Sequence, residues 1–519
     1  MKKRIVSLLL AVLMLASAFC FTACTGDKGG STTTPAITDG KTPTPGGDTT
    51  TVPEDTTAGL AIPDDDLEEY EFLIYEVSFS TDKGTMDFAY EEEGGSVLDE
   101  AKYKRNSLVE EKFNIVMTVE TSKGTGTTGS PEGYGKMLQA KNAGDPTYDI
   151  CVLPAYDQTK LAQNGGLYDL YSVPHLDTSS VYWDQGAVKE LTIRDTLFFL
   201  AGDFSINSFS AVVAMAFNKE LAKEKGINDL YTLASEGKWT FAKFQEYTRM
   251  VSEDLNGDDK FTNMDLYGAL CWDDAIYAIV HAANQRCAYV DDNGDLVLGL
   301  GSEATYTAFN DFVNFSKEDC FLRYQVKFNE NGVATDSSSS KYGLEMFVNN
   351  QGLFFLSTVG SISTNFRDMD VDYGILPLFK MNENVDHYYG SVAPYSARFL
   401  GMPLHQNDVE VAGKVLETIG YYSASTIIPA YYDKTLNGSV VRDEESSPML
   451  DIIRQHRVFD LGYFYQPGNI NKELIFQFRA ANADWISVYK NKERAAALYL
   501  KNINKSLAEQ AASWESEKE

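Results

Sequence analysis

Basic residues are scarce in this chain. Its 519 residues include 44 Lys and Arg against 75 Asp and Glu, which gives a formal net charge of −31. No cluster of Lys or Arg stands out, and proteins that bind nucleic acids use such clusters to neutralise phosphates. The composition therefore argues against a nucleic-acid partner. Long apolar runs are scarce too: after the run at 5–19, no other stretch approaches the roughly 20 residues that span a bilayer.

Cysteine is also rare. Beyond the N-terminal pair, the cysteines lack the close spacing of metal sites; they are Cys151, Cys271, Cys287 and Cys320. Cys151 lies in an apolar run and is expected in the core. A disulfide among the other three stays open, because an oxidising compartment would permit one.

Sequence signatures of catalysis are missing as well. There is no Gly-x-Ser-x-Gly, no His-Glu-x-x-His and no phosphate loop, and the five histidines are scattered. We therefore expect that the chain is not an enzyme. The 75 acidic residues leave room for two carboxylates facing across a cleft, so an extracellular glycoside hydrolase is the alternative.

The N-terminus has the pattern of an export signal. Basic residues at 2–4 precede the apolar run, and small residues lead to Cys24. The stretch 21–24 resembles a bacterial lipobox, with Phe21 where leucine is usual. This resemblance implies that Cys24 carries diacylglycerol and anchors the protein at the extracellular face of the membrane. An uncleaved anchor helix and an ordinary cleaved signal are the alternatives.

A linker and a folded body are expected after the signal at 1–24. Residues 25–63 are mostly Thr, Gly, Pro, Asp and Ser, a composition that cannot bury enough apolar surface to fold. We expect a flexible linker that reaches on the order of 30–40 Å. The rest of the chain is apolar enough for sizeable cores.

The body alternates strand and helix patterns. Predicted strands lie at 71–77, 115–120 and 148–153, with helices at 96–114 and 134–143 between them. This order predicts a parallel sheet, in which ligands gather at loops after the carboxyl ends of strands, here 154–158. Further strands are expected at 197–200, 212–217, 352–356 and 372–378. Because strands recur after a mostly helical middle, the chain is expected to cross between two lobes.

Five stretches resemble one family. They are 149–170, 181–205, 372–379, 390–403 and 422–462. Together they are similar to extracellular solute-binding proteins of bacterial ABC importers, of the family 1 type that includes maltose-binding protein. The resemblance implies an α/β, two-lobed periplasmic-binding-protein-like fold (type II) whose lobes are joined by crossover hinge segments. The predicted lobes are 64–208 plus 352–389, and 209–351 plus 390–519.

The resemblance also implies a function. A monomeric protein would clamp a small solute, most simply an oligosaccharide, between its lobes by hinge closure and deliver it to the transmembrane subunits of an ABC permease. Coupling of the same fold to a sensor kinase is an alternative that the sequence leaves open.

Candidate ligand contacts follow from what a sugar requires, namely flat apolar faces and fixed polar groups. The resemblance places Tyr156, Asp157 and Gln158 in a first-lobe loop that the family uses for ligand contact. Six further candidates lie near predicted hinges or after a predicted strand: Asp203, Phe204, Ser357, Thr358, Tyr389 and Tyr395. Trp272, with Asp273 beside it, is the best stacking candidate in the predicted second lobe.

One acidic segment has the spacing of a calcium loop. Oxygen ligands would come from alternating positions: Asp254, Asn256, Asp258, Lys260 (carbonyl), Thr262 and Asp265. Asp259 stands where glycine is usual, and Asp265 where glutamate is usual. We expect a structural Ca²⁺ here, with a solvated acidic turn as the alternative. By contrast, 291–295 predicts a hairpin turn around Asn293-Gly294.

Overall fold

The computed structural model describes residues 59–79, 85–90, 95–125, 130–323, 326–328, 334–336, 341–434 and 444–518. The predicted signal with Cys24 and the linker up to residue 58 lie outside these residues. The chain divides into two units, Met1–Gly59 and Leu60–Glu519. Ile62 is buried and Leu60 packs against the core. The folded body therefore begins at Leu60 and not at 64, since the last apolar residues of the predicted linker are part of it.

The first sheet has five strands in the order β2-β1-β3-β15-β4. They are β1 (Tyr70–Ser78), β2 (Ile115–Lys123), β3 (Ile150–Pro154), β4 (Phe199–Leu200) and β15 (Arg398–Gly401). β1 pairs in parallel with β2 and β3, as predicted from the strand–helix alternation, and β15 is antiparallel to β3 and β4.

The helices of this part follow their local sequence signals. Ser96 caps α2 (Val97–Phe113) in a capping box with Asp99, and Asn114 ends the helix in the left-handed conformation at φ 50°. α2 packs against α14 (Val409–Lys434). The other helices here are α3 (Lys136–Ala143), α4 (Ala155–Gln163) and α5 (Gln185–Leu191).

The second sheet also has five strands, in the order β13-β5-β12-β6-β9. They are β5 (Val213–Asn218), β6 (Tyr267–Cys271), β9 (Phe321–Arg323), β12 (Gly352–Thr358) and β13 (Tyr373–Pro377). β5 is antiparallel to β12 and β13, and β6 is parallel to β12 and β9. Both sheets are therefore mixed.

Strand pairing contradicts the predicted lobe boundaries. The sequence prediction places 352–389 in the first lobe, yet β12 and β13 pair within the second sheet. It places 390–519 in the second lobe, yet β15 pairs with β3 and α14 packs on α2. The reason is that an apolar run specifies a buried strand but not the sheet that it joins, because the pairing partners are distant in sequence.

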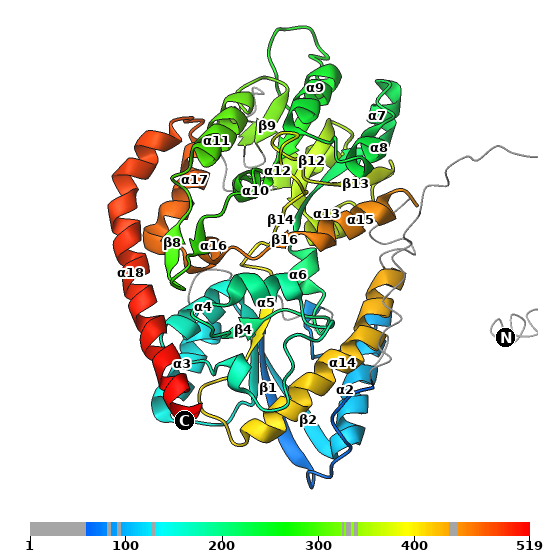
Figure 1. Ribbon diagram of the computed structural model, residues 1–519. Coiled ribbons are helices and arrows are strands. Elements are labelled where there is room, and N and C mark those ends of the chain that lie inside the picture. The colour runs from blue at the N-terminus through cyan, green and yellow to red at the C-terminus, as the bar shows by residue number, and fades with distance from the viewer. Residues whose placement is uncertain are drawn as a thin grey trace, which may run out of the picture. The chain divides into compact units, whose positions relative to one another are not determined.

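The remaining elements cover and connect the sheets (Figure 1). Short strands are β7 (Ala288–Val290), β8 (Leu296–Leu298), β10 (Val326–Phe328), β11 (Ala334–Asp336), β14 (Gly390–Ser391) and β16 (Arg457–Val458). Short helical turns are η2 (Pro131–Gly135), η3 (Leu170–Ser172) and η5 (Pro467–Asn469). Helices are α6 (Asn207–Ser210), α7 (Lys219–Glu224), α8 (Leu230–Ser235), α9 (Phe241–Val251), α10 (Ala275–Ala282), α11 (Glu303–Phe315), α12 (Lys341–Val348), α13 (Val359–Asn365), α15 (Ser446–Gln455), α16 (Leu461–Tyr465), α17 (Ile470–Arg479) and α18 (Trp485–Lys518).

The four cysteines of the body are buried free thiols, so the disulfide left open by the sequence does not form among Cys271, Cys287 and Cys320. The predicted hairpin turn joins β7 to β8, with Gly294 at φ 77°. Among the described helices, none combines the length and apolarity needed to cross a membrane.

Candidate functional site

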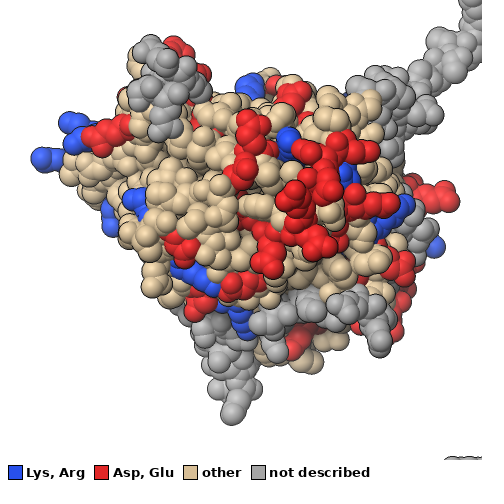
Figure 2. Space-filling model, turned by 90° about the horizontal axis from the view of Figure 1, so that it is seen from below, with Lys and Arg blue, Asp and Glu red and all other residues tan. Residues whose placement is uncertain are grey.

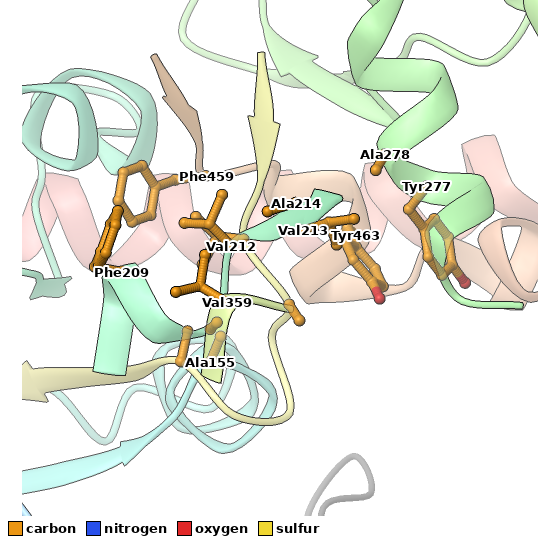
Figure 3. Close-up of a cluster of buried hydrophobic side chains, with 14 of the residues drawn as sticks. Ala155, Phe209, Val212, Val213, Ala214, Tyr277, Ala278, Val359, Phe459 and Tyr463 are labelled. Carbon is orange, nitrogen blue, oxygen red and sulfur yellow. The ribbon is translucent and has the colours of Figure 1, made fainter. Parts of the chain in front are cut away.

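Tyr156 lies at the carboxyl end of a strand of the first sheet, next to helices α16 and α10. It stands on the first turn of α4, directly after the carboxyl end of β3, and only 8% of its surface is exposed. Its ring meets that of Tyr463, on α16, edge to face at 6.5 Å. Tyr463 in turn stacks on Tyr277 of α10, with ring centroids 3.7 Å apart. Figure 3 shows the latter pair side by side, with both hydroxyls at the same end.

The position of Tyr463 is fixed by a buried carboxylate. Asp460 caps α16 by accepting hydrogen bonds from the amides of Gly462 and Tyr463, and it accepts another from His281 Nε2 at 2.8 Å. Burial alone would raise the pKa of Asp460, but the hydrogen bond and charge of His281 lower it overall. His281, Cys287 and Asp460 are close enough to hold a metal, yet amide donors already occupy the carboxylate, so we interpret the cluster as a support for α16.

A second aromatic group adjoins the first. Trp272 follows β6, and its ring meets Tyr395 in a T-shaped contact at 5.7 Å. Phe79, directly after β1, contacts the same Tyr395 ring at 5.8 Å. Aromatic side chains that follow strands of both sheets therefore meet at one place.

Two adjacent carboxylates share this place. Asp273 is 2% exposed and forms an ion pair with Arg479 Nε of α17. Burial raises the pKa of Asp273 against the lowering effect of Arg479. Burial and the neighbouring charge of Asp273 raise the pKa of Asp274 to about 7. The sequence-predicted residues that the structure brings together here are Tyr156, Trp272, Asp273 and Tyr395.

Asp157 and Gln158 serve the fold instead. The loop expected at 154–158 is absent, because α4 begins at Ala155 immediately after β3. The Asp157 carboxylate accepts hydrogen bonds from the backbone amide and the hydroxyl of Ser130, both at 2.8 Å. Gln158 Nε2 donates to the carbonyl of Phe399 at 2.8 Å and so links α4 to β15.

The other predicted contacts have partners of their own. Thr358 caps α13, and Ser357 of β12 pairs with Ala214 of β5. Phe204 is a core residue. Asp203 is half-buried and lies 3.6 Å from Arg454, and desolvation raises its pKa to about 6. Tyr389 donates to Asp386 at 3.0 Å and lies beside Arg286. A ligand role for these residues stays a prediction.

Four residues of the site were missed by the sequence reasoning: Phe79, Tyr277, Tyr463 and Asp274. Asp274 could have been found, because it follows Trp272 and Asp273 in the same turn. Tyr463 and Tyr277 could not, because no sequence pattern pairs α16 with α10.

The predicted calcium loop has compact local geometry. Asp254 accepts hydrogen bonds from the amides of Gly257 and Asp259 at 2.8 Å each, and Asp265 accepts one from Thr262 at 2.7 Å. Asp259, at the usual glycine position, has a left-handed φ of 57°. Calcium binding itself stays a prediction.

A groove of about 580 Å³ elsewhere shares none of these residues. It lies between α18 and the β7–β8 hairpin. Two of its polar side chains are paired: Arg194 Nη2 donates to Asp295 Oδ1 at 2.5 Å, and the Asn504 amide accepts from and donates to the backbone of Leu296. We assign it no ligand.

Comparison with known proteins extends the description of the fold. No family model matches the chain, and neither does any curated protein. Solved structures do match. The cyclic α-maltosyl-1,6-maltose binding protein of Arthrobacter globiformis matches with a TM-score of 0.55 and 12% identity over 84% of this chain and all (100%) of that one. UgpB from Mycobacterium tuberculosis, in complex with glycerophosphocholine, has a TM-score of 0.54 and 14% identity over 83% of this chain and 98% of its own.

A third match is a cyclo/maltodextrin-binding protein complexed with maltotetraose. It has a TM-score of 0.52 and 13% identity, over 85% of this chain and 97% of that one. At such identities the likeness concerns the fold alone. The predicted α/β class and periplasmic-binding-protein-like fold are confirmed: this chain has the fold of the substrate-binding proteins of ABC transporters.

Proposed function

We propose that this chain is the substrate-binding lipoprotein of an ABC importer and that it captures an oligosaccharide without altering it. The observation that carries the proposal is the meeting of aromatic rings and carboxylates at the ends of strands from both sheets, with Tyr156 and Tyr395 from one and Trp272 from the other. Such rings stack on the CH faces of sugars, and carboxylates accept their hydroxyl protons. The neighbours in fold that bind maltotetraose or cyclic α-maltosyl-1,6-maltose support the same class of ligand.

Capture would proceed by closure of the two halves on the solute. Only a closed state lets one solute contact groups of both halves, so binding favours closure. The permease then recognises the closed form. Small-angle scattering with and without a bound solute tests this step, and the radius of gyration should fall on binding.

Calorimetry with a panel of oligosaccharides tests the binding. We expect Trp272→Ala and Tyr395→Ala each to weaken binding about tenfold or more, because each removes a stacking face. Tyr289→Ala is a matched control, since Tyr289 is 52% exposed. Release of sugar products during the same incubations would instead favour the glycoside hydrolase.

The anchor and the import role have separate tests. Cys24→Ser should move the protein from the membrane fraction to the medium and remove the lipid from its N-terminus in mass spectra. Cells that lack the protein should lose uptake of the bound oligosaccharide. Normal uptake with lost induction of sugar-responsive genes would favour the sensor.

A further inference from the structure

Three segments of the chain connect the two sheets, and they lie side by side. The first runs from β4 through α6 to β5, and the second from β13 through β14 to β15. The third runs from α15, which packs against β13, through β16 to α16, which packs against α4. Val212 of the first bridges Val392 of the second, and β14 pairs in parallel with β16 (Figure 1). We call these the crossover segments. Any rotation of one sheet relative to the other must bend them.

Two histidine rings stack at one end of the crossover segments. His387 lies shortly before β14, and His456 directly precedes β16. Their ring centroids are 3.8 Å apart and their planes differ by 13°. The amide of Gly390 donates a hydrogen bond to the carbonyl of His456 at 2.9 Å. The rings therefore adjoin the backbone pairing that joins two of the crossover segments.

This stack is stable only while at most one ring is charged. Two imidazolium ions at such a separation repel each other, so the second proton should bind about tenfold more weakly than the first. Burial and the charge of His387 lower the pKa of His456, against the raising effect of Asp386. The His387 side chain is 46% exposed, so protons reach the pair from solvent.

One carboxylate and one phenol also face the pair. Asp386 Oδ2 lies 3.6 Å from His387 Nε2, and Asp386 Oδ1 accepts a hydrogen bond from the Tyr389 hydroxyl at 3.0 Å. The Tyr389 ring lies 6.0 Å from that of His387 and 6.2 Å from that of His456. Cationic side chains of the neighbouring elements are held in ion pairs: Arg286 with Glu190, Arg454 with Asp203 and Arg457 with Asp184. One carboxylate thus compensates a first proton on the pair but not a second.

These charges set the pH range of the effect. The chain has a net charge of −31, and Asp and Glu crowd the face shown in Figure 2. Such a field favours proton uptake by histidine. In the stacked arrangement, however, the pKa of His456 is below its ordinary value of 6.5. Once separated, the ring binds a proton more readily. The stack is therefore fully stable above about pH 6.5 and is weakened as pH falls below that value.

We propose that His387 and His456 form a pH-sensitive switch in the crossover segments. In mild acid, the doubly protonated rings separate and loosen the pairing of β14 with β16. Closure on a solute requires crossover segments that hold one geometry, so protons loosen what the solute must order, and the affinity for the solute falls in acid. This last consequence rests on the proposed function, whereas the separation of the rings does not.

NMR of the ligand-free protein, labelled in its histidines, tests the switch without any solute. We expect His387 and His456 to titrate as a coupled pair, with midpoints about one pH unit apart, and to lose their ring contact by pH 5. His387→Phe and His456→Phe each keep a flat partner but remove one proton site, so the remaining ring should show a single midpoint. His405→Phe is the control, since it removes a half-buried imidazole outside the crossover segments, and it should keep both midpoints.

Calorimetry with a bound oligosaccharide at pH 7.5 and pH 5 measures the consequence for capture. Asp203 and Asp274 also titrate in this range, but every variant keeps them, so the differences between proteins isolate the histidine pair. We expect the acid loss of affinity to be about fivefold larger in the intact protein and in His405→Phe than in either crossover variant.

The outcomes separate the two proposals. Independent midpoints, a ring contact kept at pH 5, or the same acid loss of affinity in all four proteins overturns the switch and leaves the proposed function standing. If no oligosaccharide binds at either pH, the proposed function fails, and the NMR titration still decides whether the rings separate. Coupled midpoints, with the extra acid loss absent from both crossover variants and kept in His405→Phe, support both.

Discussion

The two sheets bury different kinds of side chain. Beside the first, charged groups are inside: Glu76 is 0% exposed, Asp87 3% and Arg398 2%. Beside the second, the core is a cluster of rings, in which Phe244 lies 4.8 Å from Phe379 and 5.4 Å from Phe354. Burying apolar rings stabilises a fold outright, whereas buried charges add little net stability and tend to fix one geometry.

The charges beside the first sheet hold the edge at which the candidate site lies. Arg398 begins β15, and its guanidinium reaches Asp87 at 2.9 Å, Glu76 at 3.4 Å and the carbonyl of Thr85. The segment 85–90 is thereby tied to the strand that follows Tyr395. We infer that the buried charges beside the first sheet mainly fix the position of segment 85–90 relative to β15. The aromatic core beside the second sheet mainly stabilises the fold.

Replacing Arg398 should give the largest loss of stability and so test the difference between the two sheets most strongly. Arg398→Met removes the guanidinium that contacts both buried carboxylates, Glu76 and Asp87, and we expect a loss of about 3–5 kcal/mol in the free energy of unfolding. Burial already raises the pKa of Glu76, ahead of the lowering effect of Arg398. Without Arg398 this pKa should rise further, so the loss should be fully present at pH 8 and shrink as pH falls toward the unfolded-state value. Urea titrations at pH 8 and pH 5 measure both effects.

Two variants control that experiment. Arg494→Met removes a guanidinium from an exposed position of α18 and should change stability by no more than about 0.5 kcal/mol. Adding Glu76→Gln and Asp87→Asn to Arg398→Met should recover part of the loss, since the stranded charges are then gone. A triple variant less stable than Arg398→Met would contradict the charge explanation.

The aromatic core of the second sheet should respond without regard to pH. Phe244→Ala opens a cavity among rings that carry no charge, and we expect a loss of about 3 kcal/mol, at the lower end for such changes. The loss at pH 5 should equal that at pH 8. A marked pH dependence in this variant would remove the distinction between the two sheets.

The sequence predicted where most strands lie, but not which sheet each strand joins. Apolar runs predicted most of the long strands, and the end of a predicted strand pointed to Tyr156, because such ends are where α/β folds present side chains. Trp272 was chosen as an aromatic stacking residue, since β6 before it was not predicted. The sheet that β12 joins could not be predicted, because a wholly buried strand has the same composition in either. Gln158 was placed at the site because a loop was expected, and its true role depends on a hydrogen bond to Phe399, far along the chain.

α18 contacts both the part of the chain around the first sheet, here called the first half, and the part around the second sheet, the second half. Its two ends therefore allow the stability of each half to be tested separately. Near its start, Trp485 Nε1 donates to the carbonyl of Leu300 at 2.9 Å and the ring packs on Phe309, in the second half. Near its end, Trp514 packs on Tyr168 of the first half at 4.3 Å. Trp514→Ala should cost about 2 kcal/mol through lost burial, while Leu498→Ala, 60% exposed, should be nearly neutral. Equal effects in thermal unfolding would show that the end of α18 does not stabilise the first half.

Calcium should have the smallest effect on stability. It should act only through the loop from Asp254 to Asp265, beside the second sheet. The loop from Asp254 to Asp265 connects α9 to β6, and extracellular calcium modules bind with dissociation constants of about 10⁻⁴–10⁻³ M. At about 1 mM calcium, mass action then gives a stabilisation of roughly 0.4–1.4 kcal/mol. Replacing calcium by a chelator should lower the melting temperature by a degree or two. Asp258→Asn should remove this response, while Asp291→Asn in the β7–β8 turn should keep it. Identical melting in chelator and in calcium would leave the segment as a solvated acidic turn.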